Sequence, residues 1–289
     1  METSELLKRV RKIEIKTRGL SSNIFAGQYH TAFKGRGMAF SEVREYQFGD
    51  DIRNIDWNVT ARFNHPYVKV FEEEREMTVM LLIDVSGSRA FGTHNQLKQH
   101  VMAEIAATLA YSAIQNNDKI GVIFYSDTLE KFIPPQKGKK HILYIIRELI
   151  EFQPKSLGTD LGGALKYLTS VIKKRCTTFV ISDFIDVNDF QTDLTIANRK
   201  HDVVAIQLYD KRETELPSVG LLTVKDAETG QERLLDTTSN AVRKAWKTWW
   251  VQHNQRLQDV FKKSQVDAVS VSTDEDYVKA LINLFNLRS

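Results

Sequence analysis

The sequence predicts an α/β fold: a doubly wound, mostly parallel sheet with helices on both faces. Short uninterrupted apolar runs recur along the chain, helical patterns separate them, and two of the runs end in an aspartate. An apolar run without polar interruption is typical of a strand buried on both faces, as in parallel sheets. Strands that alternate with helices indicate crossover connections and therefore a parallel order. With 289 residues, the chain is long enough to bury one large core of this kind.

The first quarter of the chain differs from this pattern. A one-sided apolar spacing predicts a short amphipathic helix over Ser4 to Lys16. Glycines then punctuate residues 17–76, which predicts loops and short β segments. We therefore expect two parts. Residues 1–76 form an N-terminal helix and a glycine-rich β/loop subdomain, and residues 77–289 form the α/β domain.

Within this subdomain, carboxylates and arginines alternate from Asp50 to Arg62. Arginine among carboxylates discourages a dication. The pattern therefore favours a compact network of ion pairs over a second metal centre or the acidic cluster of a hydrolase. We expect this segment to have a structural role.

The elements of the α/β domain follow in order along the chain. Buried strands are predicted at residues 78–84, 118–125, 177–183, 201–209 and 268–272, with a short edge strand at 129–133. Helices with an apolar stripe are predicted at residues 97–115, 139–151, 161–174, 191–200, 240–264 and 277–287. This alternation indicates a sheet that helices cover from both sides.

A hairpin and a long helix are predicted near the C-terminus. The turn signal Glu228-Thr229-Gly230 indicates a hairpin with strands at residues 221–225 and 232–235. The long helix that follows contains three tryptophans at helical spacing: Trp246, Trp249 and Trp250. Such a stripe is more often part of a core than a binding patch, so we assign it to the core.

The first predicted strand of the α/β domain leads into a cluster of oxygen donors. Asp84 ends the strand, and Ser86 and Ser88 follow at alternate positions. Open α/β sheets bind their ligands at the carboxyl ends of their strands. One carboxylate and two hydroxyls are hard ligands that suit Mg²⁺ or Mn²⁺. Alone, the same residues are also typical of a turn that caps the next helix.

Two further loops strengthen the metal interpretation. Thr159 and Asp160 precede a predicted helix, and Asp183 ends the strand that begins at Thr177. With these three loops the chain resembles the von Willebrand factor A fold and its metal-ion-dependent adhesion site. The resemblance implies one Mg²⁺ or Mn²⁺ ion held by five residues: Asp84, Ser86, Ser88, Thr159 and Asp183.

The segment before the first of these loops shows a second resemblance. The phrases FSEVREYQFGDDIRNIDWNVTAR (residues 40–62) and YVKVFEEERE (residues 67–76) are long and unusual. They resemble the bacterial family known as domain of unknown function 58, in which proline is typical where this chain has Phe48. That family is commonly encoded beside MoxR-type AAA+ ATPases and other von Willebrand A-like proteins. The resemblance implies an adaptor or cochaperone role with such an ATPase as partner.

Composition bears on three further questions: nucleic-acid partners, disulfides and membrane or signal segments. A net charge of +3 without a lysine or arginine block gives no reason to expect nucleic acid as a partner. The single cysteine, Cys176, excludes an internal disulfide framework. No apolar run approaches the ~20 residues that a transmembrane helix needs, and the N-terminus has no signal-peptide core. We expect a cytoplasmic protein.

Catalytic motifs are missing from the sequence. It contains no Walker phosphate loop, no G-x-G-x-x-G, no H-E-x-x-H and no G-x-S-x-G. Ser86 and Ser88 have no adjacent base that could activate a hydroxyl nucleophile. We therefore expect a metal-dependent protein-protein interaction module and not an enzyme. The alternative is a metal-dependent phosphatase or nuclease, which would need a base or second metal near Asp84.

Overall fold

The computed structural model of the chain describes residues 39–72, 77–91 and 97–288. These residues fall into two compact units, which divide between Glu76 and Met77. The helix expected over Ser4 to Lys16 lies outside the described residues. The two units are considered separately below.

The smaller unit is a two-stranded antiparallel sheet with two short helices between its strands. Its elements are β1 (Ala39–Glu45), η2 (Ile52–Asn54), α3 (Trp57–Phe63) and β2 (Tyr67–Glu72). The Asp56 carboxylate begins α3 by accepting hydrogen bonds from the next helical N–H groups. Three carboxylates of this segment pair with cations: Asp50 with Arg44 at 2.8 Å, Asp51 with Arg53 at 3.2 Å and Asp56 with Lys69 at 3.4 Å. The carboxylates are paired, as a structural role predicts, but two of the three pairs use cations outside the alternating segment and the pairs do not form the compact network that was expected.

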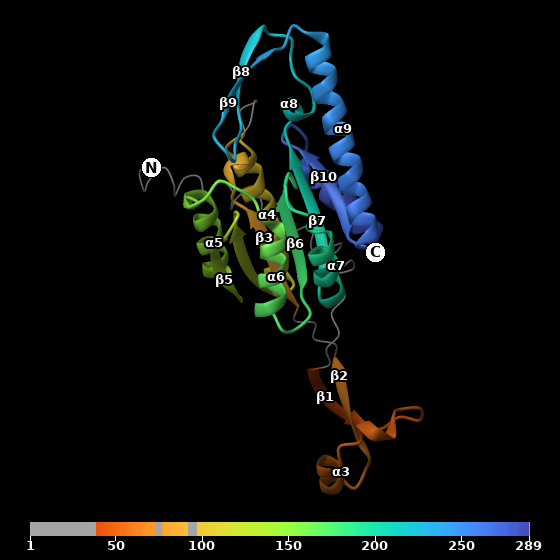
Figure 1. Cartoon of the computed structure of the whole chain (residues 1–289). Helices are drawn as coiled ribbons and strands as arrows, with labels where there is room; N and C mark the ends of the chain where they lie inside the picture. The colour runs from red at the N-terminus through yellow and green to blue at the C-terminus, as the bar shows by residue number, and fades with distance from the viewer. Residues whose placement is uncertain (1–38, 73–76, 92–96, 289) are drawn as a thin grey trace. The chain divides into compact units, whose positions relative to one another are not determined.

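The larger unit is built on a six-stranded sheet in the order β10-β7-β6-β3-β4-β5. Its strands are β3 (Thr78–Asp84), β4 (Lys119–Tyr125), β5 (Leu129–Gln136), β6 (Thr177–Ser182), β7 (Asp202–Tyr209) and β10 (Asp267–Ser272). Every neighbouring pair is parallel except β4 and β5, which are antiparallel. The predicted fold class, a mostly parallel doubly wound sheet, is confirmed (Figure 1).

Helices cover both faces of this sheet. One face holds α4 (Lys98–Gln115), α5 (Lys139–Glu151) and α10 (Tyr277–Arg288). The other face holds α6 (Leu161–Val171), α7 (Gln191–Lys200) and the second half of α9 (Asn240–Lys263). Alternate residues of β3 enter the two cores, with Leu81 in the first and Leu82 in the second. Burial on both faces explains why this strand is apolar at every position from Val79 to Ile83.

A hairpin and a short helix extend the α/β unit beyond the sheet (Figure 1). The hairpin consists of β8 (Leu221–Lys225) and β9 (Glu232–Asp236), and α8 (Lys211–Thr214) follows β7. Trp250 of α9 is buried, and the indole N–H of Trp246 donates to the carbonyl of Glu213 at 2.8 Å. Trp249 is 46% exposed, so the assignment of the whole stripe to the core is wrong at this position. The first half of α9 leaves the sheet, and its outer face is therefore in solvent.

His201 makes the stability of this unit dependent on pH. The side chain is fully buried, with Nδ1 3.3 Å from the sulfur of Cys176, and burial lowers the pKa of His201 from 6.5 to about 4. Between these values the unfolded chain binds more protons than the folded chain, so stability falls as the pH decreases. We expect His201→Asn to lose less unfolding free energy than the wild type between about pH 7 and pH 5 in urea titrations. Equal losses in the two proteins would contradict this assignment.

Candidate metal centre

The three predicted loops meet at the carboxyl end of the central strands. β3 and β6 are adjacent parallel strands, so Asp84 at the end of β3 and Asp183 directly after β6 emerge side by side. The loop with Thr159 joins them, because Leu157 accepts a 3.0 Å hydrogen bond from the N–H of Gly87. The structure therefore places all five predicted residues at one edge of the sheet, as the topology of an open α/β sheet requires.

Hydrogen bonds connect the first loop to the third. The hydroxyls of Ser86 and Ser88 lie 3.1 Å apart, and the Ser88 hydroxyl also bonds to the carboxylate of Asp183. The backbone N–H of Ser86 donates to Asp84 Oδ1 at 2.9 Å. These contacts give the loop a defined shape, with oxygen donors from separate strands side by side.

Asp84 is an ionisable group in an almost dry environment. The residue is 2% exposed, and its Oδ2 accepts a 2.7 Å hydrogen bond from the Ser182 hydroxyl. Burial, and then the charge of Asp183, raise the pKa of Asp84 to about 7. Its hydrogen bonds therefore do not offset the cost of burying its charge, whereas a bound cation would.

Lys98 is a functional neighbour that the sequence analysis missed. It is only 2% exposed, and its Nζ lies 3.1 Å from Asp183 Oδ2 and 2.5 Å from Glu213 Oε1. Burial alone would lower the pKa of Lys98 and raise the pKa of Asp183. These ion pairs instead raise the pKa of Lys98 and lower the pKa of Asp183 relative to their ordinary values. The available signal was a lysine in the first turn of a helix that is largely apolar from Val101 onward. It resembles an ordinary solvated lysine.

The tip of the β8–β9 hairpin covers this edge of the sheet (Figure 1). A Cβ atom on Gly87 would lie 2.1 Å from the carbonyl oxygen of Ala227, so only glycine allows the turn to approach the first loop so closely. The carboxylate of Glu228 accepts a hydrogen bond from the Thr159 hydroxyl. A third carboxylate thus reaches the site, from a segment that the sequence analysis treated only as a turn.

The backbone next to Asp183 is unusual. Phe184 has a φ of 58°, a left-handed conformation that costs a non-glycine residue about 1–3 kcal/mol. Its buried ring packs edge-on against Phe261 with centroids 5.1 Å apart. Packing therefore holds the strained turn in place, and that turn directs Asp183 toward the first loop.

The residues present fit a hard dication with oxygen ligands. Among the described residues, no group of three His, Cys, Asp or Glu side chains is arranged around a common metal position, so hydroxyls would have to contribute. Adjacent oxygens around Mg²⁺, each ~2.1 Å from the ion, lie ~2.9 Å apart in an octahedron. The 3.1 Å separation of the Ser86 and Ser88 hydroxyls is close to that spacing. The ion itself remains a prediction.

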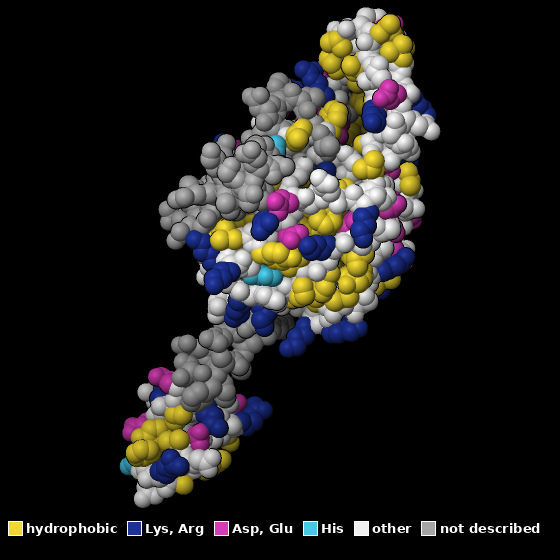
Figure 2. Space-filling view, turned by 90° about the vertical axis from the view of Figure 1, so that its left-hand side faces the viewer, with side chains coloured by type: hydrophobic (Ala, Val, Ile, Leu, Met, Phe, Trp, Pro, Cys, Tyr) yellow, Lys and Arg dark blue, Asp and Glu magenta, His cyan; other side chains and the backbone are white. Residues whose placement is uncertain are grey.

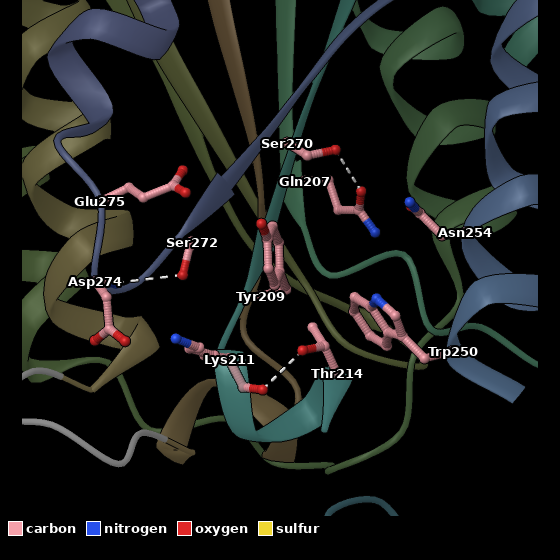
Figure 3. A pocket seen from close by; sticks show the side chains of 10 residues that line it. All are labelled: Gln207, Tyr209, Lys211, Thr214, Trp250, Asn254, Ser270, Ser272, Asp274 and Glu275. Carbon is pink, nitrogen blue, oxygen red and sulfur yellow. Dashed lines mark hydrogen bonds between the residues drawn. The ribbon is translucent and has the colours of Figure 1, made fainter. Parts of the chain in front are cut away.

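A cavity of about 450 Å³ lies elsewhere in the same unit, beside α8 and α9 (Figure 3). Tyr209 and Trp250 form its aromatic side, and the Ser270 hydroxyl donates to Gln207 at 2.7 Å within it. None of the five predicted metal ligands lines this cavity. Thr214 on its wall directly follows Glu213, the partner of Lys98.

Comparison with known proteins identifies the family. A family model described as protein of unknown function DUF58 matches residues 42–256, which include all three loops. The chain belongs to the DUF58 family. DUF58 membership confirms the resemblance that the two phrases of the smaller unit indicated. Proteins of Mycobacterium bovis and Mycobacterium tuberculosis are each 26% identical over 284 residues, covering 98% of this chain and 89% of the relative.

Solved structures share the fold at low sequence identity. An aerotolerance-related membrane protein from Bacteroides fragilis matches 73% of this DUF58 chain and 99% of its own chain, with 15% identity and a TM-score of 0.51. The SpRpn10 VWA domain matches 73% of this chain and 95% of its own, with 12% identity and a TM-score of 0.43. The α/β unit therefore shares its fold with the Bacteroides fragilis protein, and its mostly parallel sheet covered by helices is the architecture that the sequence predicted.

Proposed function

We propose that this DUF58 protein is a metal-dependent protein-protein interaction module. One Mg²⁺ or Mn²⁺ ion is held by Asp84, Ser86, Ser88, Thr159 and Asp183, and an acidic side chain of a partner completes its coordination. The contacts of Ser88 are the main support, since this hydroxyl joins Ser86 to Asp183 across two loops. Asp84 and Asp183 offset two charges at most, and Asp183 is already paired with Lys98, so the dication keeps part of its positive charge and attracts one more anionic oxygen.

The proposed partner is a MoxR-type AAA+ ATPase, with other von Willebrand A-like proteins as further partners. Family resemblance supports this assignment, which gives the chain an adaptor or cochaperone role. On the face drawn in Figure 2, lysines and arginines are interspersed with acidic and apolar side chains. That distribution lacks the one-sided basic field of a nucleic-acid-binding surface. No helix in the described part of the chain has the length and apolarity needed to cross a bilayer.

Thr159→Val tests whether the ion takes part in the interface. The change removes one hydroxyl ligand at nearly constant volume, so we expect capture of the purified ATPase to fall strongly, as it should with chelator. Thr169→Val is the matched control, because the Thr169 hydroxyl bonds only to the Lys166 carbonyl on the exposed side of α6. Both variants should retain melting temperatures close to that of the wild type. Undiminished capture under both treatments would leave the ion as a structural brace and place docking elsewhere, for example on residues 35–76.

We further propose that the isolated protein has no hydrolytic activity. The sequence contains no phosphate loop. Among the residues that the structure describes, the hydroxyls of the site bond to carboxylates or to one another, not to a histidine base. With Mn²⁺ present, turnover of ATP, a phosphomonoester and DNA should stay at the level of the buffer blank. Metal-stimulated turnover that disappears in Asp183→Ala would favour the phosphatase or nuclease alternative.

A further inference from the structure

The turn between β8 and β9 rests directly on the first loop of the proposed metal site. Ala227 is so close to Gly87 that a Cβ atom there would lie 2.1 Å from the Ala227 carbonyl oxygen. Glu228, the next residue, faces inward and is partly buried, whereas Ala227 and Thr229 on either side are exposed. Its carboxylate accepts a hydrogen bond from the Thr159 hydroxyl.

The turn is built to hold Glu228 in this position. The Asp226 carboxylate accepts hydrogen bonds from the N–H groups of Glu228 and Thr229, at 3.0 and 2.8 Å. The N–H of Gly230 donates to the Asp226 carbonyl at 2.9 Å, and Gly230 has a φ of 70°. These bonds close a tight turn on antiparallel strands, so the position of Glu228 is set by the hairpin backbone and not by a free loop.

Like charges surround the Glu228 carboxylate. Asp183, Asp186 and Asp226 all lie near enough to act on it electrostatically. A carboxylate brought among carboxylates is repelled, and a dication between them reverses the sign of that interaction. A cation bound at this site would therefore offset the repulsion that the hairpin backbone imposes on Glu228.

We propose that Glu228 is the chain's own acidic ligand at the open position of this metal site, and that the β8–β9 turn closes the site until a partner displaces it. The inference rests on the proposed metal site. The Glu228 carboxylate lies next to the hydroxyl of Thr159, which is itself one of the proposed ligands. A partner carboxylate would then exchange with Glu228 and would not enter a vacant position. Partner binding would therefore be coupled to opening of the hairpin.

Mn²⁺ serves as the probe, with Glu228→Gln as the test variant and Glu232→Gln as the matched control. Glu232 is an exposed carboxylate of the same hairpin, in β9. We expect Glu228→Gln to weaken Mn²⁺ binding about 10-fold in calorimetry, while Glu232→Gln leaves it unchanged. Bound Mn²⁺ should relax water protons faster in Glu228→Gln, because water takes the position that the carboxylate held. Circular dichroism checks that both variants are folded.

Trypsin reports on the hairpin itself. Lys225 and Arg233 flank the turn and are exposed. Mn²⁺ should slow cleavage after these residues in the wild type and in Glu232→Gln, but not in Glu228→Gln. A wild type that binds no Mn²⁺ would overturn the proposed function. If the wild type binds Mn²⁺ and Asp84→Asn does not, equal affinity, relaxation and protection in wild type and Glu228→Gln would overturn only the assignment of Glu228.

Discussion

Asp84→Asn is expected to weaken Mn²⁺ binding by about 100-fold or more, which exceeds the usual effect of losing an outer-shell partner. Asp84 is the buried carboxylate at the end of β3, and the substitution removes its charge while preserving its shape. The same change removes a buried charge that lies near Asp183. Without metal, we therefore expect the variant to be at least as stable as the wild type. Calorimetry with Mn²⁺ and urea titration without metal measure the two effects.

Asp118→Asn is the matched control for this experiment. Asp118 is equally buried but lies at the opposite end of the sheet, where its Oδ1 accepts a 2.8 Å hydrogen bond from the N–H of Met77. Its replacement should leave Mn²⁺ affinity at the wild-type value. If Asp84→Asn also binds Mn²⁺ like the wild type, the three loops do not form a metal site. The segment from Asp84 to Ser88 would then be only a turn.

Lys98→Met is expected to lower the unfolding free energy by about 3–5 kcal/mol, the range for removing one partner of a buried ion pair. Lys98 contacts both Asp183 and Glu213, and the substitution leaves two carboxylates without this cation in a region from which water is excluded. Urea titration without metal measures the loss. Added Mn²⁺ should restore part of it, because the ion would then offset the charge of Asp183.

Lys131→Met provides the comparison at the surface. Lys131 pairs with Glu148 at 2.7 Å, but its side chain is 34% exposed, so water replaces much of the lost interaction. The expected cost is about 1 kcal/mol or less. Similar losses in Lys98→Met and Lys131→Met would show that the buried pair does not stabilise the fold as inferred. If Mn²⁺ does not stabilise Lys98→Met, the charge of Lys98 is not coupled to metal binding.

The sheet of the larger unit was predictable because its signals are local. β3 is apolar from Val79 to Ile83 because it is buried on both faces, so a run of a few apolar residues is enough to indicate the strand. The hairpin was predictable for the same reason, since Gly230 marks a turn that needs a positive φ. The resemblance to the von Willebrand factor A site implied which side chains of the three loops meet, and the common edge at which parallel strands end agrees with it.

Trp249 shows that a helical pattern alone does not predict burial. Its spacing places it on the same stripe as Trp250, yet Trp249 is 46% exposed while Trp250 is buried. The difference arises because only the second half of α9 packs on the sheet. A helical stripe predicts which side of a helix is apolar. How far along the helix that side is covered depends on the elements next to it.

By itself, the sequence determined the α/β class, the positions of the strands and the five oxygen donors of the candidate metal site. Only the tertiary structure decided which charges surround those donors. Lys98 and Glu213 are 115 positions apart, and Glu228 reaches Thr159 from a hairpin turn, so no local spacing connects them. In the sequence, each resembles a solvated surface residue. Folding brings these three residues together because the segments that carry them meet at the same edge of the sheet. Burial there strengthens the interactions between neighbouring charges.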